Sequence, residues 1–293
     1  MADFGGRGNG GLRDILRFGD CGLDRCAGSG QGWGMLRGLL FVCGLLCAGV
    51  ASADGFAPGV CMSAPYEGQG ADARLVEVVR DVERAIAGFS EFRAAWARGA
   101  PDICLSDDLF EERGYFDPSQ NRIVLDASLS RGLMGAVLVH ELRHVEQFQL
   151  GICPGIRLDM AEYARATFAL EADASVSSVV VAWQARRAGE PAYWENLRDW
   201  DMSGDIADRF EEVMQRTGDV TLAAAAAFDQ WYASDLRRER YYVASCSAFL
   251  DEQDRTHALS GYDLLPSDYL DGLCRLPDGR AYDCAEGDLA PVR

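Results

Sequence analysis

The sequence predicts an α+β fold that is mostly helical and forms one domain. Three observations support this prediction: long stretches with an apolar residue every three or four positions, a short stretch with the pattern of a β-hairpin, and no internal repeat or linker. Of the 293 residues, 48% are hydrophobic and 25% are charged, which is ordinary for a globular protein. This composition excludes a disordered chain, a collagen-like chain and a multi-pass membrane protein.

The beginning of the chain has the features of an export signal. Residues 1–34 are rich in glycine, and from Met35 the chain has one arginine, an apolar stretch and a small-x-small ending at residues 51–53. This is the pattern of a secretory signal peptide over residues 35–53, and its apolar stretch is shorter than the ~20 residues that cross a bilayer. We therefore expect a periplasmic or secreted domain over residues 54–293 with no membrane span, whereas residues 1–34 are either a mis-set translation start or a long n-region.

The elements of the expected domain follow from periodicity and from helix-breaking residues. An amphipathic helix is predicted from residue 72 to about residue 98, and residues 114–125 resemble a hairpin around an Asp-Pro turn. Two strong helices follow over residues 133–150 and 160–187, each ended by glycine and proline. The chain beyond residue 194 is predicted to be mostly helical, until a cysteine-containing tail begins after about residue 256.

The cysteines of the expected mature domain are even in number, which favours disulfides in an exported chain. We expect all six to be oxidised, and they show no C-x-x-C spacing that would favour a zinc site. Only Cys274 and Cys284, which flank a Pro-Asp-Gly turn, are close enough in sequence to predict a specific pair. The other four are Cys61, Cys104, Cys153 and Cys246.

The charge of the chain excludes several functions. The 46 acidic residues outnumber 28 basic ones for a formal net charge of −18, so a nucleic-acid backbone would be repelled. All 28 basic residues are arginines, which excludes a Schiff-base lysine, a P-loop lysine and Ser-Lys catalysis. The only basic cluster, Arg237–Arg240, is expected to be a solvated helix face.

The sequence His140-Glu141-Leu142-Arg143-His144 lies inside the first of the two strong helices. Residues four apart on a helix lie on one face, so both imidazoles can bind one metal ion while Glu141 lies beside it. The motif thus offers two nitrogen ligands and a carboxylate able to take a proton from water on the metal. Because the chain has three histidines in all, a chance occurrence of this spacing is rare.

A catalytic zinc ion needs a third protein ligand, and the next helix offers Glu162, Glu171 and Asp173. If this helix packs antiparallel to the first, Glu171 lies about 18 Å along it from Asp159 and reaches the level of the histidines. Glu162 lies only about 5 Å along and has the spacing of a capping box with Asp159. Asp173 is turned about 200° around the helix from Glu171, so Glu171 is the predicted ligand.

The motif HELRHxxQ, followed by EADA on the next helix, resembles the gluzincins, which are zincins with a glutamate ligand. In particular it resembles a bacterial metallopeptidase family known mainly as an uncharacterised domain, over about residues 114–178. The resemblance implies a zincin-like fold in which His140, His144 and Glu171 bind Zn²⁺ and Glu141 is the general base and acid. It also implies that the strand Arg122–Leu125 is the edge on which an extended peptide pairs.

The sequence departs from the gluzincin pattern four positions after the expected glutamate ligand. Many gluzincins have an acidic or amide residue there, where this chain has Ser175, with Asp173 two positions after the ligand instead. The residue that stabilises the oxyanion also stays open. Its four candidates are His257, Tyr163, Tyr241 and Tyr242.

The sequence therefore predicts an exported zinc metallopeptidase that hydrolyses peptide bonds of a peptide or protein substrate through zinc-bound water. An alternative is a non-catalytic cell-envelope protein in which the same helices hold a structural or vestigial zinc ion and the domain binds a partner. Glu141 favours catalysis, because a structural site has no use for a carboxylate beside the metal. A hydrolase of another bond, such as a cell-wall amidase, is also compatible with the motif.

Overall fold

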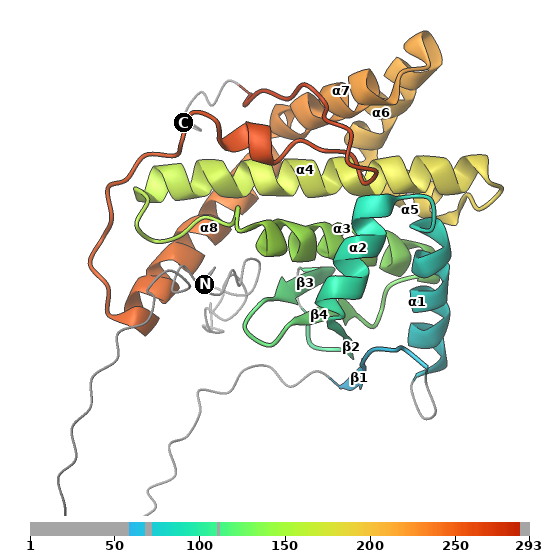
Figure 1. The fold of residues 1–293 in the computed structure, drawn as a ribbon, viewed down its shortest axis with the longest axis horizontal. Coiled ribbons are helices and arrows are strands. Elements are labelled where there is room, and N and C mark those ends of the chain that lie inside the picture. Colours follow the sequence, from blue (N-terminus) through green and yellow to red (C-terminus); the bar gives the residue numbers. More distant parts are fainter. Residues whose placement is uncertain (1–58, 68–71, 110–111, 288–293) are drawn as a thin grey trace, which may run out of the picture.

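The structure is a computed structural model that describes residues 59–67, 72–109 and 112–287 (Figure 1). The predicted leader at residues 1–34, the signal peptide at 35–53 and the expected mature start at residue 54 lie outside these ranges. Within them, no helix combines the length and the apolar character needed to cross a membrane.

The fold is α+β and mostly helical, as predicted. The described residues form eight α-helices, one short 3₁₀ helix and one four-stranded sheet. The elements are β1 Val60–Met62, α1 Ala73–Ala85, α2 Ser90–Gly99, β2 Asp102–Ser106, β3 Gly114–Asp117, β4 Arg122–Asp126, α3 Arg131–Leu150, α4 Met160–Arg187, α5 Ala192–Asp199, α6 Gly204–Thr217, α7 Val220–Ala233, α8 Asp235–Thr256 and the 3₁₀ helix Tyr269–Gly272.

The sheet has the order β1-β2-β4-β3, with β2 and β4 parallel and the other pairs antiparallel. The predicted hairpin is therefore present as β3 and β4. The prediction that Arg122–Leu125 forms an edge was wrong, because β4 is paired on its other side with β2, from Asp102↔Arg122 to Ser106↔Asp126. The edge on this side of the sheet is β3.

The predicted helix over residues 72–98 is two helices. α1 ends after Ala85, and Phe89 has an extended backbone before α2 begins. Gly88 lies in this break, where glycine costs a helix more than other residues do. The break lets α2 turn its own apolar face into the core, and its first backbone N–H groups, those of Glu91 and Phe92, donate to the carbonyl of Pro277 in the C-terminal tail.

The predicted helix pair is present as α3 and α4, which cross the centre of the molecule side by side with the sheet on the far side of α3 (Figure 1). Their contacts join Gln147 with Leu170 and Ala136 with Ser178, so the two helices run antiparallel. Both helices are buried over most of their length. The sequence motif therefore lies at the centre of the fold.

Close approach of the sheet to α3 depends on a glycine. A Cβ atom at Gly114, the first residue of β3, would lie 2.7 Å from a methyl group of Val137 on α3. The absence of a side chain therefore brings the edge strand against the helix that carries the histidines.

The capping box expected at the start of α4 does not form. Asp159 caps the helix by accepting a hydrogen bond from the N–H of Ala161. The Glu162 carboxylate instead accepts from the N–H of Leu265, in the tail, and pairs with Arg165. Glu162 therefore contacts the tail and does not cap the helix, although its spacing from Asp159 predicted a cap.

The prediction that Arg237–Arg240 is a solvated face was wrong for its first residue. Arg237 is 1% exposed and forms a two-bond ion pair with Asp205 of α6. It also donates to the backbone carbonyls of Trp231 and Met202. This buried guanidinium joins the start of α8 to α6, α7 and the loop before α6.

Two disulfides are present, Cys61–Cys104 and Cys274–Cys284. The second is the predicted pair, and the first joins β1 to β2 at directly opposed positions. Cys153 and Cys246 belong to neither disulfide, contrary to the expectation that all six cysteines pair.

Candidate metal centre

The two histidines of the motif face each other one turn apart on α3. Their rings lie edge to face with centroids 4.8 Å apart, and the Nε2 atoms of His140 and His144 are separated by 3.1 Å. Helix periodicity produces this arrangement, because residues at i and i+4 lie one above the other. Both ring nitrogens are therefore directed to the same point.

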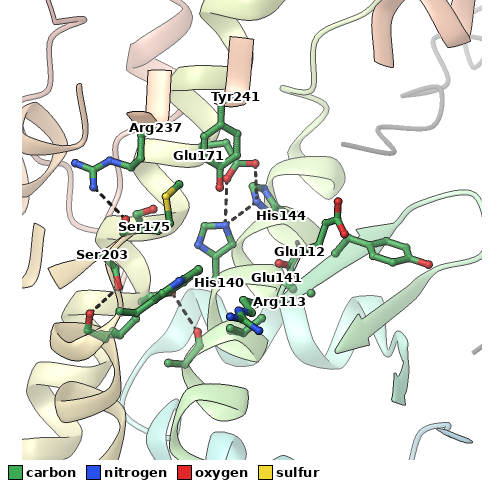
Figure 2. A pocket seen from close by; sticks show the side chains of 18 of the residues that line it. Glu112, Arg113, His140, Glu141, His144, Glu171, Ser175, Ser203, Arg237 and Tyr241 are labelled. Carbon is green, nitrogen blue, oxygen red and sulfur yellow. Dashed lines mark hydrogen bonds and ion pairs between the residues drawn. The ribbon is translucent and has the colours of Figure 1, made fainter. Parts of the chain in front are cut away.

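Glu171 of α4 completes a cluster of three ligand-type side chains, shown in Figure 2. Its Oε2 lies 3.3 Å from His140 Nε2, and its Oε1 lies 3.3 Å from His144 Nε2. Nitrogen and oxygen ligands at about 2.0–2.1 Å from a tetrahedral zinc ion lie about 3.4 Å from one another. The donor set and its spacing are thus compatible with a metal ion.

The cluster is exposed on one side only. The side chains of His144 and Glu171 are 6% and 3% exposed, whereas that of His140 is 20% exposed. All three line a pocket that opens between the edge strand β3 and the elements from α5 to α8. A small molecule or an extended chain can therefore reach the cluster from this pocket.

The charges of the cluster are coupled. Burial disfavours the charged forms of both His144 and Glu171. The attraction and hydrogen bonding between the opposite charges are together larger than this effect of burial. The pKa of His144 is raised to about 9, and the pKa of Glu171 is lowered well below its usual range, with His140 contributing to the latter. A cation is thus favoured between these groups, and a divalent metal would take the place of the proton.

Gln147, one turn after His144, fixes which nitrogen of that ring faces the cluster. The Gln147 amide NH₂ donates to the Leu170 carbonyl at 3.1 Å and to Asp173 at 2.9 Å, so its oxygen is turned toward His144. That oxygen lies 2.8 Å from His144 Nδ1. The Nδ1–H group is therefore the donor, and Nε2 presents its lone pair to the ligand position.

Glu141 lies beside the cluster without being part of it. Its side chain is 5% exposed and accepts a hydrogen bond from the backbone N–H of Phe116 in β3. Burial raises the pKa of Glu141, although His144 and His140 act in the opposite direction. The carboxylate is thus held at the pocket wall next to the ligands, where it can accept a proton.

Of the four candidates for the oxyanion stabiliser, the structure brings Tyr241 to the pocket. Tyr241, on α8, lines the pocket together with Glu171, as labelled in Figure 2, and hydrogen bonds to the Glu171 carboxylate. Tyr163 is buried against Phe249, with ring centroids 5.4 Å apart. Tyr242 is 47% exposed, and His257 is the exposed left-handed residue that ends α8.

Asp173, which was set aside as a ligand, faces away from the cluster into a buried network. It pairs with Arg143 of the motif, accepts from Gln147 and accepts from the hydroxyl of Tyr282 at 2.8 Å. The side-chain support of His144 therefore comes from α3 itself through Gln147, rather than from the position of Ser175.

Sequence reasoning missed most of this support. Gln147 has the i+3 spacing that places it on the face of His144, and this signal could have identified it. Nothing in the sequence indicates that Tyr282, 109 residues after Asp173, reaches the site. The wall opposite β3 was missed as well, and it includes Leu197, Trp200, Met202 and Trp231.

The comparison with known protein families identifies the chain. Residues 51–284 match the family described as "Putative metallopeptidase family (DUF6782)". The chain belongs to this family. The match spans the expected mature domain up to the second disulfide and contains every residue of the cluster. No curated protein and no solved structure matches the chain.

Membership supports a metallopeptidase-like chain, and therefore a hydrolase that acts on a peptide or protein. The His140, His144 and Glu171 cluster is compatible with the metal ion that such a family would use. The two disulfides are consistent with an oxidising, extracellular compartment.

Proposed function

We propose that this protein is an exported zinc-dependent metallopeptidase of the gluzincin type, with one zincin-like domain over residues 54–293. The proposal is supported by the ligand-type atoms of His140, His144 and Glu171, which lie within 4.8 Å of one another, with Glu141 beside them and an open pocket in front. His140, His144 and Glu171 would hold the zinc ion. A zinc ion there supplies Lewis-acid chemistry, because it polarises a carbonyl group and lowers the pKa of water.

Glu141 is proposed as the general base and acid. Its carboxylate lies at the pocket wall and is oriented by the N–H of Phe116. From this position it takes a proton from the attacking water and passes it to the leaving amine. Burial raises the pKa of Glu141 above its usual value, which is the direction that helps a carboxylate both accept and return a proton.

Tyr241 is proposed as the group that stabilises the oxyanion. Burial and the Glu171 carboxylate raise the pKa of Tyr241 well above its usual value, so its hydroxyl remains a donor. A donor at the pocket wall, next to a ligand, can hydrogen bond to the carbonyl oxygen of the scissile bond as negative charge develops on it.

The edge strand β3 is proposed to bind the substrate backbone. The N–H of Asp126 donates to the carbonyl of Arg113, so these two residues form a hydrogen-bonded pair. In an antiparallel pair such positions alternate with positions whose backbone groups point away from the partner strand. The backbone groups of Gly114 and Phe116 then face outward, as the Phe116 N–H does toward Glu141. An extended peptide pairing at Gly114 would bring its next residues to the cluster.

The test separates ligands from neighbours by metal content. We expect purified protein to carry one zinc ion, and His140→Ala or Glu171→Ala to abolish its retention. Glu162→Ala is the matched control, because this glutamate lies on the same helix but contacts Leu265 and Arg165. It should keep the zinc at a stability cost of about 1 kcal/mol, the size of one lost hydrogen bond.

Activity is tested on a broad peptide library with the zinc-loaded protein. Cleavage that a chelator abolishes and zinc restores supports the proposal. Full zinc loading without cleavage of any peptide would favour the partner-binding protein instead, and cleavage of cell-wall material without cleavage of peptides would favour the amidase.

A further inference from the structure

The C-terminal tail contacts α3 and α4 through residues that do not line the pocket. Its Cys274–Cys284 disulfide closes a loop in which the N–H of Tyr282 donates to the carbonyl of Cys274. The loop is buried through Leu273, Leu276 and Tyr282, which are 0%, 1% and 5% exposed. These side chains anchor the loop in the core of the protein.

A continuous path of hydrogen bonds leads from this loop to His144. The Tyr282 hydroxyl donates to Asp173 Oδ1 at 2.8 Å, and the other oxygen of Asp173 accepts from Gln147 at 2.9 Å. Gln147 then accepts from Nδ1 of His144 at 2.8 Å. Each group holds the next in one orientation, because a reversed Gln147 amide would direct its NH₂ group at the Nδ1–H of His144.

Arg143 makes a second link between the loop and the same carboxylate. Its guanidinium is 1% exposed, pairs with Asp173 and Glu146, and donates to the carbonyl of Leu273 at 2.7 Å. The loop therefore contacts the network at Leu273 and Tyr282, next to the two ends of its disulfide. The disulfide fixes the separation of these contacts.

We propose that Tyr282 is a positioning residue of the metal centre: acting through Asp173 and Gln147, it holds the His144 ring with Nε2 directed at the ion, and the disulfide-closed tail loop thereby sets the metal affinity. The inference rests on the part of the proposed function that assigns His140, His144 and Glu171 as ligands. It does not depend on the bond that is cleaved.

The chemistry of the path suits this role. Burial and the Asp173 carboxylate raise the pKa of Tyr282 well above its usual value, so the phenol donates at any physiological pH. Partners that hydrogen bond to a ligating histidine set its ring orientation and its basicity. Loss of such a partner lowers metal affinity roughly ten- to a hundredfold.

Tyr282→Phe is the first test, because it removes only the hydroxyl. Tyr232→Phe is the matched control: Tyr232 is also 5% exposed, and its hydroxyl has no hydrogen-bond partner among the described residues. Zinc affinity is measured by competition with a chromophoric chelator, and the site is also loaded with Co²⁺ for its absorption spectrum. We expect Tyr282→Phe to weaken zinc binding by roughly tenfold or more and to change the Co²⁺ spectrum, whereas Tyr232→Phe should change neither.

The loop itself is tested by paired disulfide variants. Cys274→Ser with Cys284→Ser should weaken zinc binding at least as much as Tyr282→Phe does, whereas Cys61→Ser with Cys104→Ser should leave it unchanged. The Cys61–Cys104 disulfide joins β1 to β2 and has no part in the path to His144.

The outcomes distinguish this inference from the proposed function. If the wild type binds zinc and folded Tyr282→Phe binds it within twofold of Tyr232→Phe with the same Co²⁺ spectrum, the inference is overturned. If Tyr282→Phe does not fold, Gln147→Leu decides by the same criteria, since it removes the acceptor of His144 directly. If the wild type binds neither metal, the ligand assignment has failed, and the proposed function fails with it.

Discussion

Replacing Glu141 by glutamine should remove the catalytic activity of this site without affecting its fold or its zinc binding. The Glu141 side chain is 5% exposed, and its one backbone donor is the N–H of Phe116. Glutamine has the same size, and its amide oxygen can accept the same hydrogen bond. None of the three proposed ligands is altered, so Glu141→Gln should remain folded and keep its zinc ion.

The size of the effect follows from the lost proton transfer. An amide cannot take a proton from water near neutral pH, and a positioned general base contributes about 10²–10⁴-fold to a rate. We therefore expect kcat/KM to fall by at least about a hundredfold, which corresponds to about 2.7 kcal/mol in activation free energy. KM should change little, because Glu141 is not expected to bind the ground state of the substrate.

The assay compares kcat/KM on one peptide that the wild type cleaves, with zinc content and the unfolding midpoint measured on the same samples. Glu162→Gln serves as the control, since it makes the same substitution on α4 at a glutamate that contacts Arg165 and Leu265. A zinc-loaded Glu141→Gln variant that retains more than a tenth of wild-type activity would refute the role of Glu141 as general base.

Three further predictions concern the surroundings of the site. Tyr241→Phe should lower kcat by about 10²–10³-fold in assays at saturating zinc, and an unaltered kcat would exclude Tyr241 as the oxyanion donor. Gly114→Ala should destabilise the protein by about 1–3 kcal/mol in denaturant unfolding, because the new Cβ would lie 2.7 Å from a methyl group of Val137, and an unchanged midpoint would show that β3 can move away from α3. Burial alone would raise the pKa of Asp205, but the hydrogen bonds from Arg237 outweigh it and hold that pKa below its usual value. The folded form therefore binds a proton less readily than the unfolded form, and the ion pair stabilises above about pH 4 and is lost as the pH falls further. The difference in unfolding midpoint between wild type and Asp205→Asn should accordingly shrink from pH 6 to pH 3, and a constant difference would contradict this account.

Local sequence patterns were sufficient to predict the two central helices and the proximity of Glu171 to the two histidines. Periodicity and stop signals predict α3 and α4 to within a few residues, and helix geometry selects Glu171 over Glu162 and Asp173. These inferences succeed because each depends on residues within one helix or on one short antiparallel connection. The orientation of Asp173, away from the cluster, follows from the same geometry.

Long-range contacts account for what the sequence did not predict. The break near Gly88 is fixed by the tail carbonyl of Pro277, and Glu162 leaves its expected cap for the backbone of Leu265. Arg237 was predicted to be a surface residue, but it forms an ion pair with Asp205 of α6. In each case a partner far along the chain decides the outcome, and neither periodicity nor residue spacing contains that information.

The tail contact has a consequence for the order in which the protein can assemble. His140 and Glu171 are 31 residues apart, whereas the contact between Asp173 and Tyr282 joins residues 109 apart. Contacts with small sequence separation form at a lower cost in loop-closure entropy, so the α3–α4 pair can come together while the last part of the chain is still being synthesised. The cluster of His140, His144 and Glu171 would then form before its support behind His144 is complete. A chain shortened before Tyr282 would resemble the nascent protein at that stage, with its ligands paired but its hold on the metal weakened.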